Sequence, residues 1–308
     1  MFDLIIIGGG PAGLTAAIYA IRKRLSVLLV SEDLGGKTNY QMDLPWSETH
    51  QVIRGVEVMD KFRRELEYLD FVHRLEAVET LTKQDGFFTV KTASNAELTA
   101  KTVILATGSR VKHLDVLGEQ EFVGRGLSYS AISYAPLFID KHTTVIGSGM
   151  LALRAVAELV QIADTVHLVA PTHGELDTPL AKSLTADPMK VVVLDGYQVK
   201  AIEGDEYAKR VIVESPEGQE SEIRTDGIFV EVGLTPNTGL VKDLAELDEQ
   251  GRVVVNNRNF TSCPGLFAAG DVTNAYAEQV LIAVGEGAKA ALSAYEYLSF
   301  LNISETDS

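Results

Sequence analysis

The residues most suited to chemistry lie near the start of the chain, in the run Gly8-Gly-Gly-Pro-Ala-Gly13. The spacing Gly8-x-Gly10-x-x-Gly13 is that of a dinucleotide-binding turn. In such a turn the first glycine allows the tight bend, the second lets a pyrophosphate approach the backbone, and the third lets the next helix pack closely. Glu32 follows at the spacing from which a carboxylate accepts a hydrogen bond from a ribose hydroxyl. An adenosine dinucleotide is therefore predicted to bind at Gly8, Gly10, Pro11, Ala12, Gly13 and Glu32.

A second turn of the same kind, Gly147-x-Gly149-x-x-Ala152, lies in the middle of the chain and predicts a second nucleotide site at Gly147, Gly149, Met150 and Leu151. Its selectivity residues are missing. The stretch Ala170-Pro-Thr-His173 offers neither an acid for a free ribose 2′-hydroxyl nor a basic cluster for a 2′-phosphate. The nearest acid, Glu175, lies too far beyond the end of the predicted strand to take this role. We therefore expect weak binding of NADPH and no better binding of NADH. His173 is expected to recover little, being mostly neutral at pH 7.

The hydrophobic pattern places each turn between a strand and a helix. Short apolar runs typical of buried parallel strands precede both turns, and helical patterns follow them. The predicted strand–helix–strand units run 3–7, 14–24 and 27–30 in the first case and 143–146, 153–162 and 165–170 in the second. An alanine-rich helix is predicted at 279–298.

The repeated unit predicts an α/β fold with two Rossmann-like dinucleotide-binding domains, the second inserted in the first. Insertion is favoured because no low-complexity linker separates the two units. We expect the first domain to comprise residues 1–113 and 242–308, and the second to comprise residues 114–241.

Composition excludes several classes of protein. The chain carries 27 basic and 43 acidic residues, a net charge of −16 that repels nucleic acid and anionic lipid. No apolar run approaches the ~20 residues that span a bilayer, so neither nucleic acid nor membrane is expected as a partner. Cys263 is the only cysteine and can form no internal disulfide, and no Cys/His spacing suggests a metal site. The first residues lead directly into a strand without a basic leader, which predicts a cytoplasmic protein or an organellar one whose transit segment is missing.

The two turns, together with Ala106-Thr-Gly108, Gly233-Leu-Thr-Pro-Asn237 and Phe267-Ala-Ala-Gly-Asp-Val272, resemble the low-molecular-weight thioredoxin reductases, which are two-dinucleotide flavoproteins. The resemblance covers nearly the whole chain. It implies FAD in the first domain and NADPH in the second, a homodimer, and a redox protein as partner. The further FAD-binding positions that it implies are Gly36, Lys37, Thr107, Gly108, Gly270, Asp271, Glu278, Gln279 and Val280.

The chain departs from this family where the chemistry takes place. Ser130 and Ser133 stand at the positions of the family's redox cysteines, and Tyr134 stands at that of its acid. A serine hydroxyl cannot form a disulfide, so the polypeptide as written cannot be a dithiol–disulfide reductase. Lys37 replaces a family glutamine, and Glu278 replaces a family arginine.

The serines have two explanations. The chain is either a natural member that has lost thiol chemistry or a variant of a parent that carried Cys-Ala-Ile-Cys. Tyr134 favours the first, because replacing the cysteines would not require a change of the acid. The two explanations stay open.

The leading functional hypothesis is an FAD-dependent oxidoreductase of the thioredoxin reductase type whose electron donor is not NADPH. In related branches the donor is ferredoxin, or a second flavin fills the NADPH site; an acidic ferredoxin fits poorly with a charge of −16 unless a basic face exists. The alternatives are a ferredoxin–NADP reductase of the same fold, which would keep a 2′-phosphate site and a C-terminal extension, and a non-enzymatic flavin- or nucleotide-binding redox sensor. The second site is expected to hold a second flavin, weakly bound NAD(P)H, or nothing.

Overall fold

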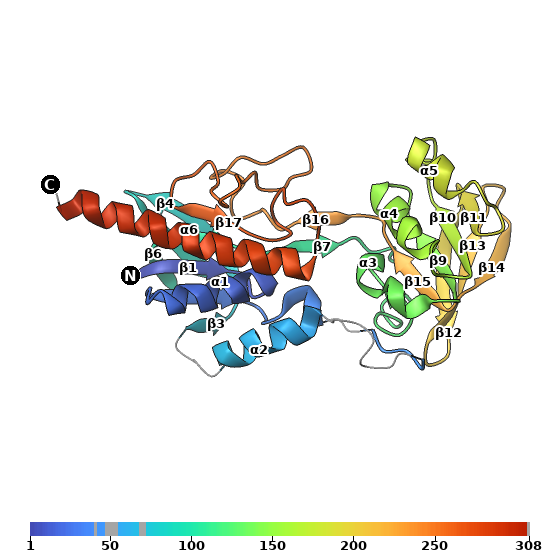
Figure 1. Cartoon of the computed structure of the whole chain (residues 1–308), viewed down its shortest axis with the longest axis horizontal. Coiled ribbons are helices and arrows are strands. Elements are labelled where there is room, and N and C mark those ends of the chain that lie inside the picture. The colour runs from blue at the N-terminus through green and yellow to red at the C-terminus, as the bar shows by residue number, and fades with distance from the viewer. Residues whose placement is uncertain (40–41, 47–54, 68–71, 307–308) are drawn as a thin grey trace. The chain divides into compact units, whose positions relative to one another are not determined.

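The computed structural model describes residues 1–39, 42–46, 55–67 and 72–306. The chain folds into two compact units (Figure 1). The described residues of unit 1 are 1–39, 55–67, 72–110 and 235–306, and those of unit 2 are 42–46 and 111–234. The strands β7 (Ser109–Val111) and β16 (Leu234–Pro236), which begin and end the long segment of unit 2, pair with each other.

Unit 1 is built on a sheet with the strand order β3-β2-β1-β6-β5-β4, in which β17 also pairs with β6. The strands β3, β2, β1, β6 and β17 run parallel to one another, whereas β5 pairs antiparallel with both β4 and β6. The bounds of the elements are β1 (Phe2–Ile7), α1 (Pro11–Arg22), β2 (Val27–Ser31), η1 (Gly36–Asn39), α2 (Gly55–Glu67), β3 (His73–Leu75), β4 (Val78–Gln84), β5 (Phe87–Thr92), β6 (Glu97–Leu105), β17 (Leu266–Ala268) and α6 (Val280–Thr306).

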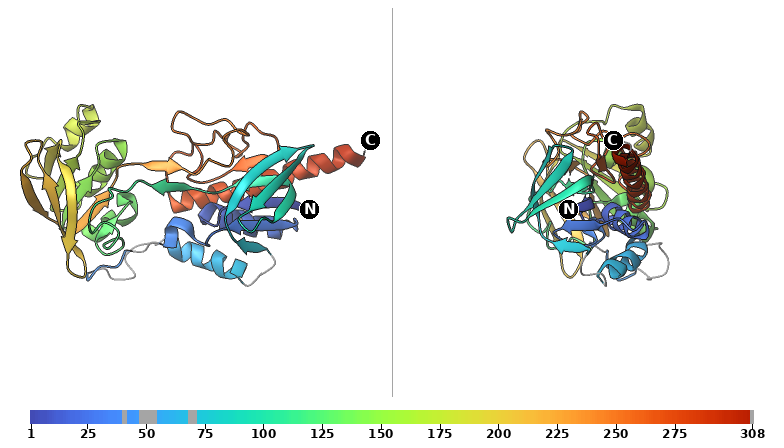
Figure 2. Two further views of the ribbon diagram at one scale, coloured as in Figure 1. Left: turned by 180° about the vertical axis from the view of Figure 1, so that it is seen from behind. Right: turned by 90° about the vertical axis from the view of Figure 1, so that its left-hand side faces the viewer.

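Both faces of this sheet are buried, as the continuous apolar run of β1 requires. Leu4 and Ile6 pack in the core under α1 and α6, and Ile5 and Ile7 pack in the core on the opposite face. The helices α1 and α6 lie side by side over the first face in Figure 1, and Figure 2 shows β4 and β5 from the other side. Small residues allow the two helices to approach closely; those fully buried are Ala16, Ala17, Ala20, Ala290 and Ala294.

Unit 2 is built on a parallel sheet with the strand order β11-β10-β9-β15-β8. The helices α3, α4 and α5 cover one face, and the antiparallel sheet β12-β13-β14 covers the other. The bounds of the elements are β8 (Leu127–Ser128), α3 (Ala131–Tyr134), η2 (Ala135–Phe138), β9 (His142–Ile146), α4 (Met150–Leu159), β10 (Thr165–Ala170), α5 (Pro179–Leu184), β11 (Val191–Asp195), β12 (Gln198–Gly204), β13 (Ala208–Glu214), β14 (Glu220–Arg224) and β15 (Gly227–Val230).

The predicted fold class, an α/β fold with two Rossmann-like units, is confirmed. Several bounds differ from the prediction. The helix α1 starts at Pro11 rather than at residue 14, because proline at the first helical position has its φ angle preset and lacks an N–H that would be unpaired there anyway. The helix α6 continues to Thr306, beyond the predicted end at 298.

The limits of the units also differ from the expected domain limits. Unit 2 spans Val111–Leu234 rather than 114–241, and it includes residues 42–46. Met42 and Leu44 are buried in the core of unit 2, and the indole N–H of Trp46 donates to the carbonyl oxygen of Leu137 at 2.8 Å. Nothing in the local sequence of 42–46 indicates this packing, because the partners lie about 90 residues away.

Candidate nucleotide-binding and redox sites

The first glycine-rich turn connects β1 to α1 and is shaped by close backbone approach. A Cβ atom on Gly13 would lie 1.8 Å from the carbonyl oxygen of Gly8, so no larger residue fits at the third position. A Cβ on Gly10 would meet nothing within 4 Å, which leaves open the face where a pyrophosphate would approach. Gly10 is also the N-cap of α1, and no side chain caps that end. The N–H groups of the first turn are therefore available to an anion.

Hydrogen bonds connect the first turn to the end of β2 and to the segment that follows it. The N–H of Gly9 donates to Ser31 Oγ at 2.8 Å, and the N–H of Gly35 donates to the carbonyl oxygen of Gly9 at 2.8 Å. The N–H of Gly36 donates to Asp33 Oδ1 at 2.8 Å. Glu32 is exposed directly after β2, where the sequence predicted a ribose contact.

Thr107 and Gly108 follow β6 and are fixed by a residue far along the chain. Thr107 Oγ1 donates to the carbonyl oxygen of Asn237, and Asn237 Nδ2 donates back to the carbonyl oxygen of Thr107, both at 2.8 Å. The N–H of Asn237 donates to the carbonyl oxygen of Gly108 at 3.0 Å. The sequence shows Asn237 as part of a family motif but does not predict this role, because the hydrogen-bonded residues lie 130 positions apart.

Lys37 and Asp271, two separately predicted FAD-binding positions, form an ion pair. Lys37 Nζ lies 2.6 Å from Asp271 Oδ2 and donates to Ser109 Oγ at 3.1 Å. The side chain of Asp271 is 13% exposed and that of Lys37 is 40% exposed, so the ion pair is partly shielded from water. A Cβ on Gly270 would lie 3.1 Å from Ala12 Cβ, which places the Gly270-Asp271 pair beside the first turn.

Glu278, Gln279 and Val280 lie at the N-terminal end of α6, whose first residue is Val280. The carbonyl oxygen of Gln279 accepts the N–H of Ala283 at 2.9 Å. All three side chains are half-buried.

Ser130 and Ser133 are brought together by α3, in unit 2. Their Oγ atoms lie 2.9 Å apart in a hydrogen bond. Ser130 is the N-cap of α3, and its N–H donates to Ser128 Oγ at 3.1 Å. The N–H of Ala131 donates to Glu231 Oε1 at 2.8 Å. The short helix therefore holds two hydroxyl groups in contact, but neither can carry electrons.

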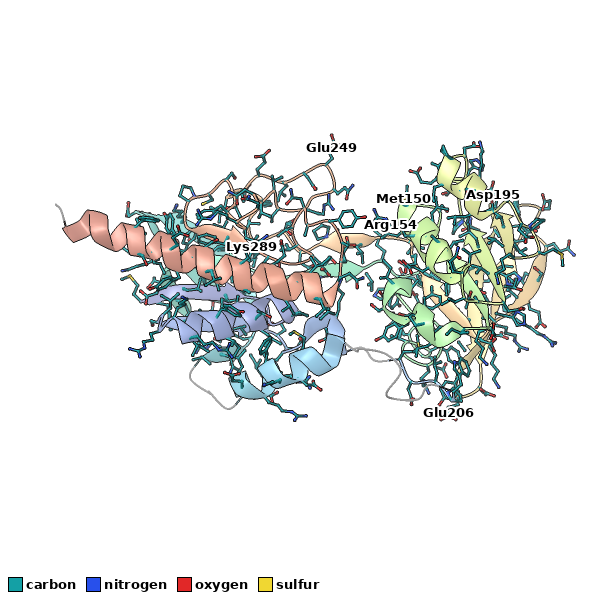
Figure 3. All side chains as sticks on the ribbon, in the orientation of Figure 1. Met150, Arg154, Asp195, Glu206, Glu249 and Lys289 are labelled. Carbon is teal, nitrogen blue, oxygen red and sulfur yellow. The ribbon has the colours of Figure 1, made fainter. Side chains whose placement is uncertain are left out.

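The second glycine-rich turn connects β9 to α4 and repeats the features of the first. Gly149 is the N-cap of α4 without a side-chain cap, and a Cβ there would meet nothing within 4 Å. Met150 begins the helix and is exposed; Figure 3 labels it with Arg154 on α4. Ser148, between the two glycines, fixes the loop after β10: its Oγ accepts the N–H of Thr172 at 3.1 Å and its carbonyl oxygen accepts the N–H of Glu175 at 2.8 Å.

A charged cluster lies at the carboxyl ends of β10 and β11. We refer to His173, Asp177, Lys182 and Asp195 as the His173 cluster. His173 Nδ1 lies 2.6 Å from Asp195 Oδ2, and Nε2 lies 3.0 Å from Asp177 Oδ2. Lys182 Nζ lies 3.1 Å from Asp177 Oδ1. Figure 3 labels Asp195 at the end of β11.

The hydrogen bond to Asp195, followed by that to Asp177, raises the pKa of His173 above its ordinary value. The hydrogen bonds from His173 and Lys182 lower the pKa of Asp177. The pKa of His173 is therefore higher than the ordinary value on which the expectation of a mostly neutral ring rested. Sequence reasoning correctly found no acid at Ala170 but missed Asp195, which is the register partner of Ala170 on the neighbouring strand.

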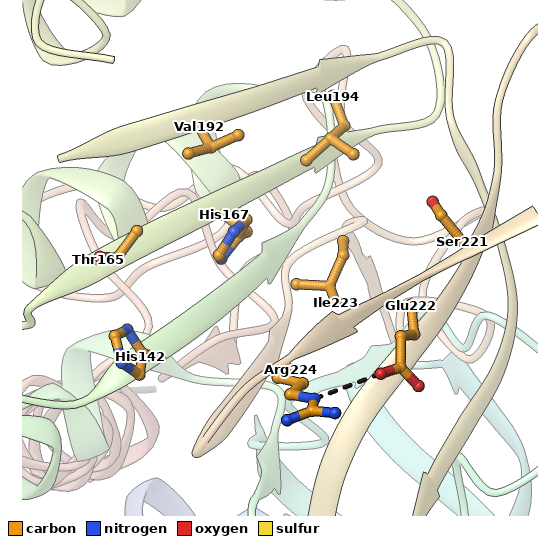
Figure 4. A pocket seen from close by; sticks show the side chains of 9 residues that line it. All are labelled: His142, Thr165, His167, Val192, Leu194, Ser221, Glu222, Ile223 and Arg224. Carbon is orange, nitrogen blue, oxygen red and sulfur yellow. Dashed lines mark hydrogen bonds and ion pairs between the residues drawn. The ribbon is translucent and has the colours of Figure 1, made fainter. Parts of the chain in front are cut away.

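A hollow of about 510 Å³ lies elsewhere on unit 2, between the sheet β11-β10-β9 and β14 (Figure 4). Its lining includes His142 and Thr165, the first residues of β9 and β10. Ligands of parallel sheets bind beyond the carboxyl ends of the strands, so this hollow is not the predicted nucleotide site. Burial lowers the pKa of His167, which also lines it.

The described part of the chain holds neither a metal-binding cluster nor a membrane-spanning helix. Within it, no group of three or more His, Cys, Asp or Glu side chains is arranged to hold a metal ion. None of the helices so described is both long enough and apolar enough to cross a membrane.

Two strand–turn–helix units with open glycine turns, one inserted in the other along the chain, define an α/β protein with two dinucleotide-binding folds. The family model for pyridine nucleotide-disulphide oxidoreductases matches residues 2–287. The chain belongs to this family of flavin-dependent oxidoreductases.

Named relatives agree with this assignment. The crystal structure of a thioredoxin reductase from Streptococcus pyogenes MGAS5005 superimposes with a TM-score of 0.87 at 34% identity, over 97% of this chain and 98% of that chain. An NADH dehydrogenase of Bacillus subtilis is 36% identical over 96% of this chain, and the F component of an alkyl hydroperoxide reductase of Pseudomonas putida is 35% identical over 96%. The chain spans 58% of the length of these two curated relatives.

Proposed function

We propose that this chain is an FAD-dependent oxidoreductase of the thioredoxin reductase type, that its electron donor is not NADPH, and that it performs no dithiol–disulfide exchange at residues 130 and 133. The observation that carries the proposal is the pair of hydroxyl groups of Ser130 and Ser133, whose oxygens lie 2.9 Å apart where the family has two thiols. A hydroxyl has no accessible disulfide state and stays protonated at neutral pH.

The residues of unit 1 fit FAD. The open face at Gly10 and the uncapped N-terminus of α1 suit a pyrophosphate, and the exposed carboxylate of Glu32 suits a ribose hydroxyl. Asp271 and Lys37 adjoin the same turn and provide one acceptor and one donor for the ribityl–phosphate region. Bound FAD would supply a two-electron carrier, which accepts a hydride and passes electrons on.

The proposed donor selectivity follows from the charge of the loop after β10. In the family a basic cluster holds the 2′-phosphate of NADPH, whereas this chain has Ala170, Pro171 and Thr172 there. Lys182 is already paired with Asp177. Two charge-assisted arginine bonds are worth about 3–6 kcal/mol in total, so their loss lowers the affinity for NADPH by about two to four decades.

The test uses the purified protein. We expect FAD to be released on denaturation at about one per chain, slow bleaching of the flavin on anaerobic mixing with NADPH, and no reduction of thioredoxin. Fast, saturable bleaching by micromolar NADPH would refute the donor half of the proposal. Turnover of thioredoxin would refute the thiol half, and a colourless protein would refute the whole.

The partners are part of the proposal. We expect a homodimer, as in the thioredoxin reductases, and a thioredoxin-like or ferredoxin-like redox protein as the exchange partner. Light scattering at micromolar concentration tests the first, since a monomeric mass contradicts it. Flavin reduction by reduced ferredoxin, compared with dithionite as a positive control, tests the ferredoxin case.

A further inference from the structure

We infer that the second glycine-rich turn takes a dinucleotide with a free adenosine 2′-hydroxyl, NAD(H) rather than NADP(H), and that Asp195 together with His173 reads that end of the ligand. The inference rests on the proposed function only in treating the nucleotide as an electron donor. Nucleotide binding itself is a property of unit 2 and can be measured without turnover.

Strand register brings a carboxylate to the edge of the sheet where the end of β10 offers none. A dinucleotide site of this kind usually places a carboxylate at the end of the strand that follows the glycine turn and its helix. That strand is β10, and it ends in Ala170. The parallel neighbour β11 ends in Asp195, and the two residues are register partners. The carboxylate is thus displaced by one strand along the same edge of the sheet.

His173 connects Asp195 with the loop that contacts the glycine-rich turn. Its ring is held between Asp195 and Asp177, at 2.6 Å and 3.0 Å. The loop that carries it is bound to Ser148, inside the turn itself, through the N–H groups of Thr172 and Glu175. The adenosine end of a nucleotide whose pyrophosphate lies on this turn would therefore meet the His173 cluster.

The charge of the cluster decides between the two nucleotides. With His173 protonated, two cations and two carboxylates cancel, and Glu175 nearby makes the sum −1; with a neutral ring the sum is −2. A 2′-phosphate adds a further charge of about −2 at neutral pH and is repelled. A 2′-hydroxyl instead donates a hydrogen bond to a carboxylate. The side chains of His173 and Asp195 are 57% and 42% exposed, so a ligand can reach both.

The experiment is calorimetric titration of the intact protein with NAD⁺ and with NADP⁺, for the native chain, D195N and E206Q. Glu206 is an exposed carboxylate at the far end of unit 2 from Asp195 (Figure 3), so E206Q removes the same charge away from the proposed site. We expect the native chain and E206Q to bind NAD⁺ at least about tenfold more tightly than NADP⁺. D195N should lose about ten- to a hundredfold in NAD⁺ affinity, the worth of one hydrogen bond to a charged group.

Measuring both nucleotides distinguishes the loss of a specific contact with the 2′-hydroxyl from a structural defect in the variant. D195N should weaken NAD⁺ while leaving NADP⁺ unchanged or tighter, whereas a structural defect would weaken both equally. Equal losses for both nucleotides, an NAD⁺ affinity of D195N within twofold of native, or a native preference for NADP⁺ would overturn the inference. The proposed function fails separately: a colourless protein that prefers NAD⁺ refutes the flavin proposal alone, and a yellow protein that does not prefer NAD⁺ refutes this inference alone.

Discussion

Two glycines in α6 should respond in opposite directions to the same substitution. A Cβ on Gly287 would lie 2.0 Å from the carbonyl oxygen of Ala12 and 2.8 Å from its carbonyl carbon. Both atoms are backbone atoms in the first turn of α1, so no side-chain rotation relieves the clash. A Cβ on Gly285, half a turn earlier, would meet nothing within 4 Å. Gly285→Ala is therefore a matched control for Gly287→Ala.

The magnitudes follow from two competing effects. Alanine replaces glycine inside a helix with a gain of about 0.5–1 kcal/mol, which G285A should show in full. G287A has the same gain, offset by overpacking of about 1–3 kcal/mol. The clash is with backbone, so we expect a cost at the upper end and a net loss of about 2 kcal/mol. Because Ala12 belongs to the Gly8–Gly13 turn, G287A should also retain less flavin.

Amide hydrogen exchange of α1 and α6, with denaturant unfolding, measures both variants. The only tryptophan, Trp46, packs on unit 2, so its fluorescence transition should stay unchanged in both variants and serves as an internal control. Equal stability and equal flavin content of G285A and G287A would refute the inferred contact between α6 and the first turn. A shift of the Trp46 transition would show that the effect is not local.

The remaining predictions concern the two turns and the hydroxyl pair. Gly10→Val should give a colourless protein with unchanged far-ultraviolet circular dichroism, because the new side chain fills the pyrophosphate face but meets no protein atom within 4 Å of its Cβ; a yellow variant would contradict this. The double change Ser130→Cys with Ser133→Cys should form a disulfide on mild oxidation, seen as the loss of two hydrogens by mass spectrometry, because the present oxygens lie 2.9 Å apart; two freely titrating thiols would contradict it. The preference for NAD⁺ over NADP⁺ should grow as pH rises through the raised pKa of His173, since the ring then loses its positive charge; in His173→Ala the preference should be independent of pH between about 7.5 and 9, where the 2′-phosphate no longer titrates.

The fold was predictable because its signals are local. The strand, the glycine spacing and the helix that make each turn lie within 25 residues of one another, and their physical roles can be assigned without knowing what else packs nearby. The position of Glu32 directly after β2 was predictable for the same reason, and its contact with a ribose stays a prediction. The resemblance to thioredoxin reductases also led to Lys37 and Asp271, but not to their ion pair, because the two residues lie 234 positions apart and a lysine at that position departs from the family pattern.

The adenosine end of the second site shows why the rest was not predictable. Sequence reasoning considered the end of β10, found Ala170, and inferred that no acid serves the site. The acid that we infer for this site, Asp195, lies on β11, and its position relative to Ala170 depends on strand order and register, which a single sequence does not specify when both strands are short apolar runs. The raised pKa of His173 could not be predicted for the same reason, since its largest cause is the hydrogen bond to Asp195, 22 residues further on. A missing residue at an expected position is therefore weak evidence against a binding site, because a neighbouring parallel strand presents its last residue at the same edge of the sheet.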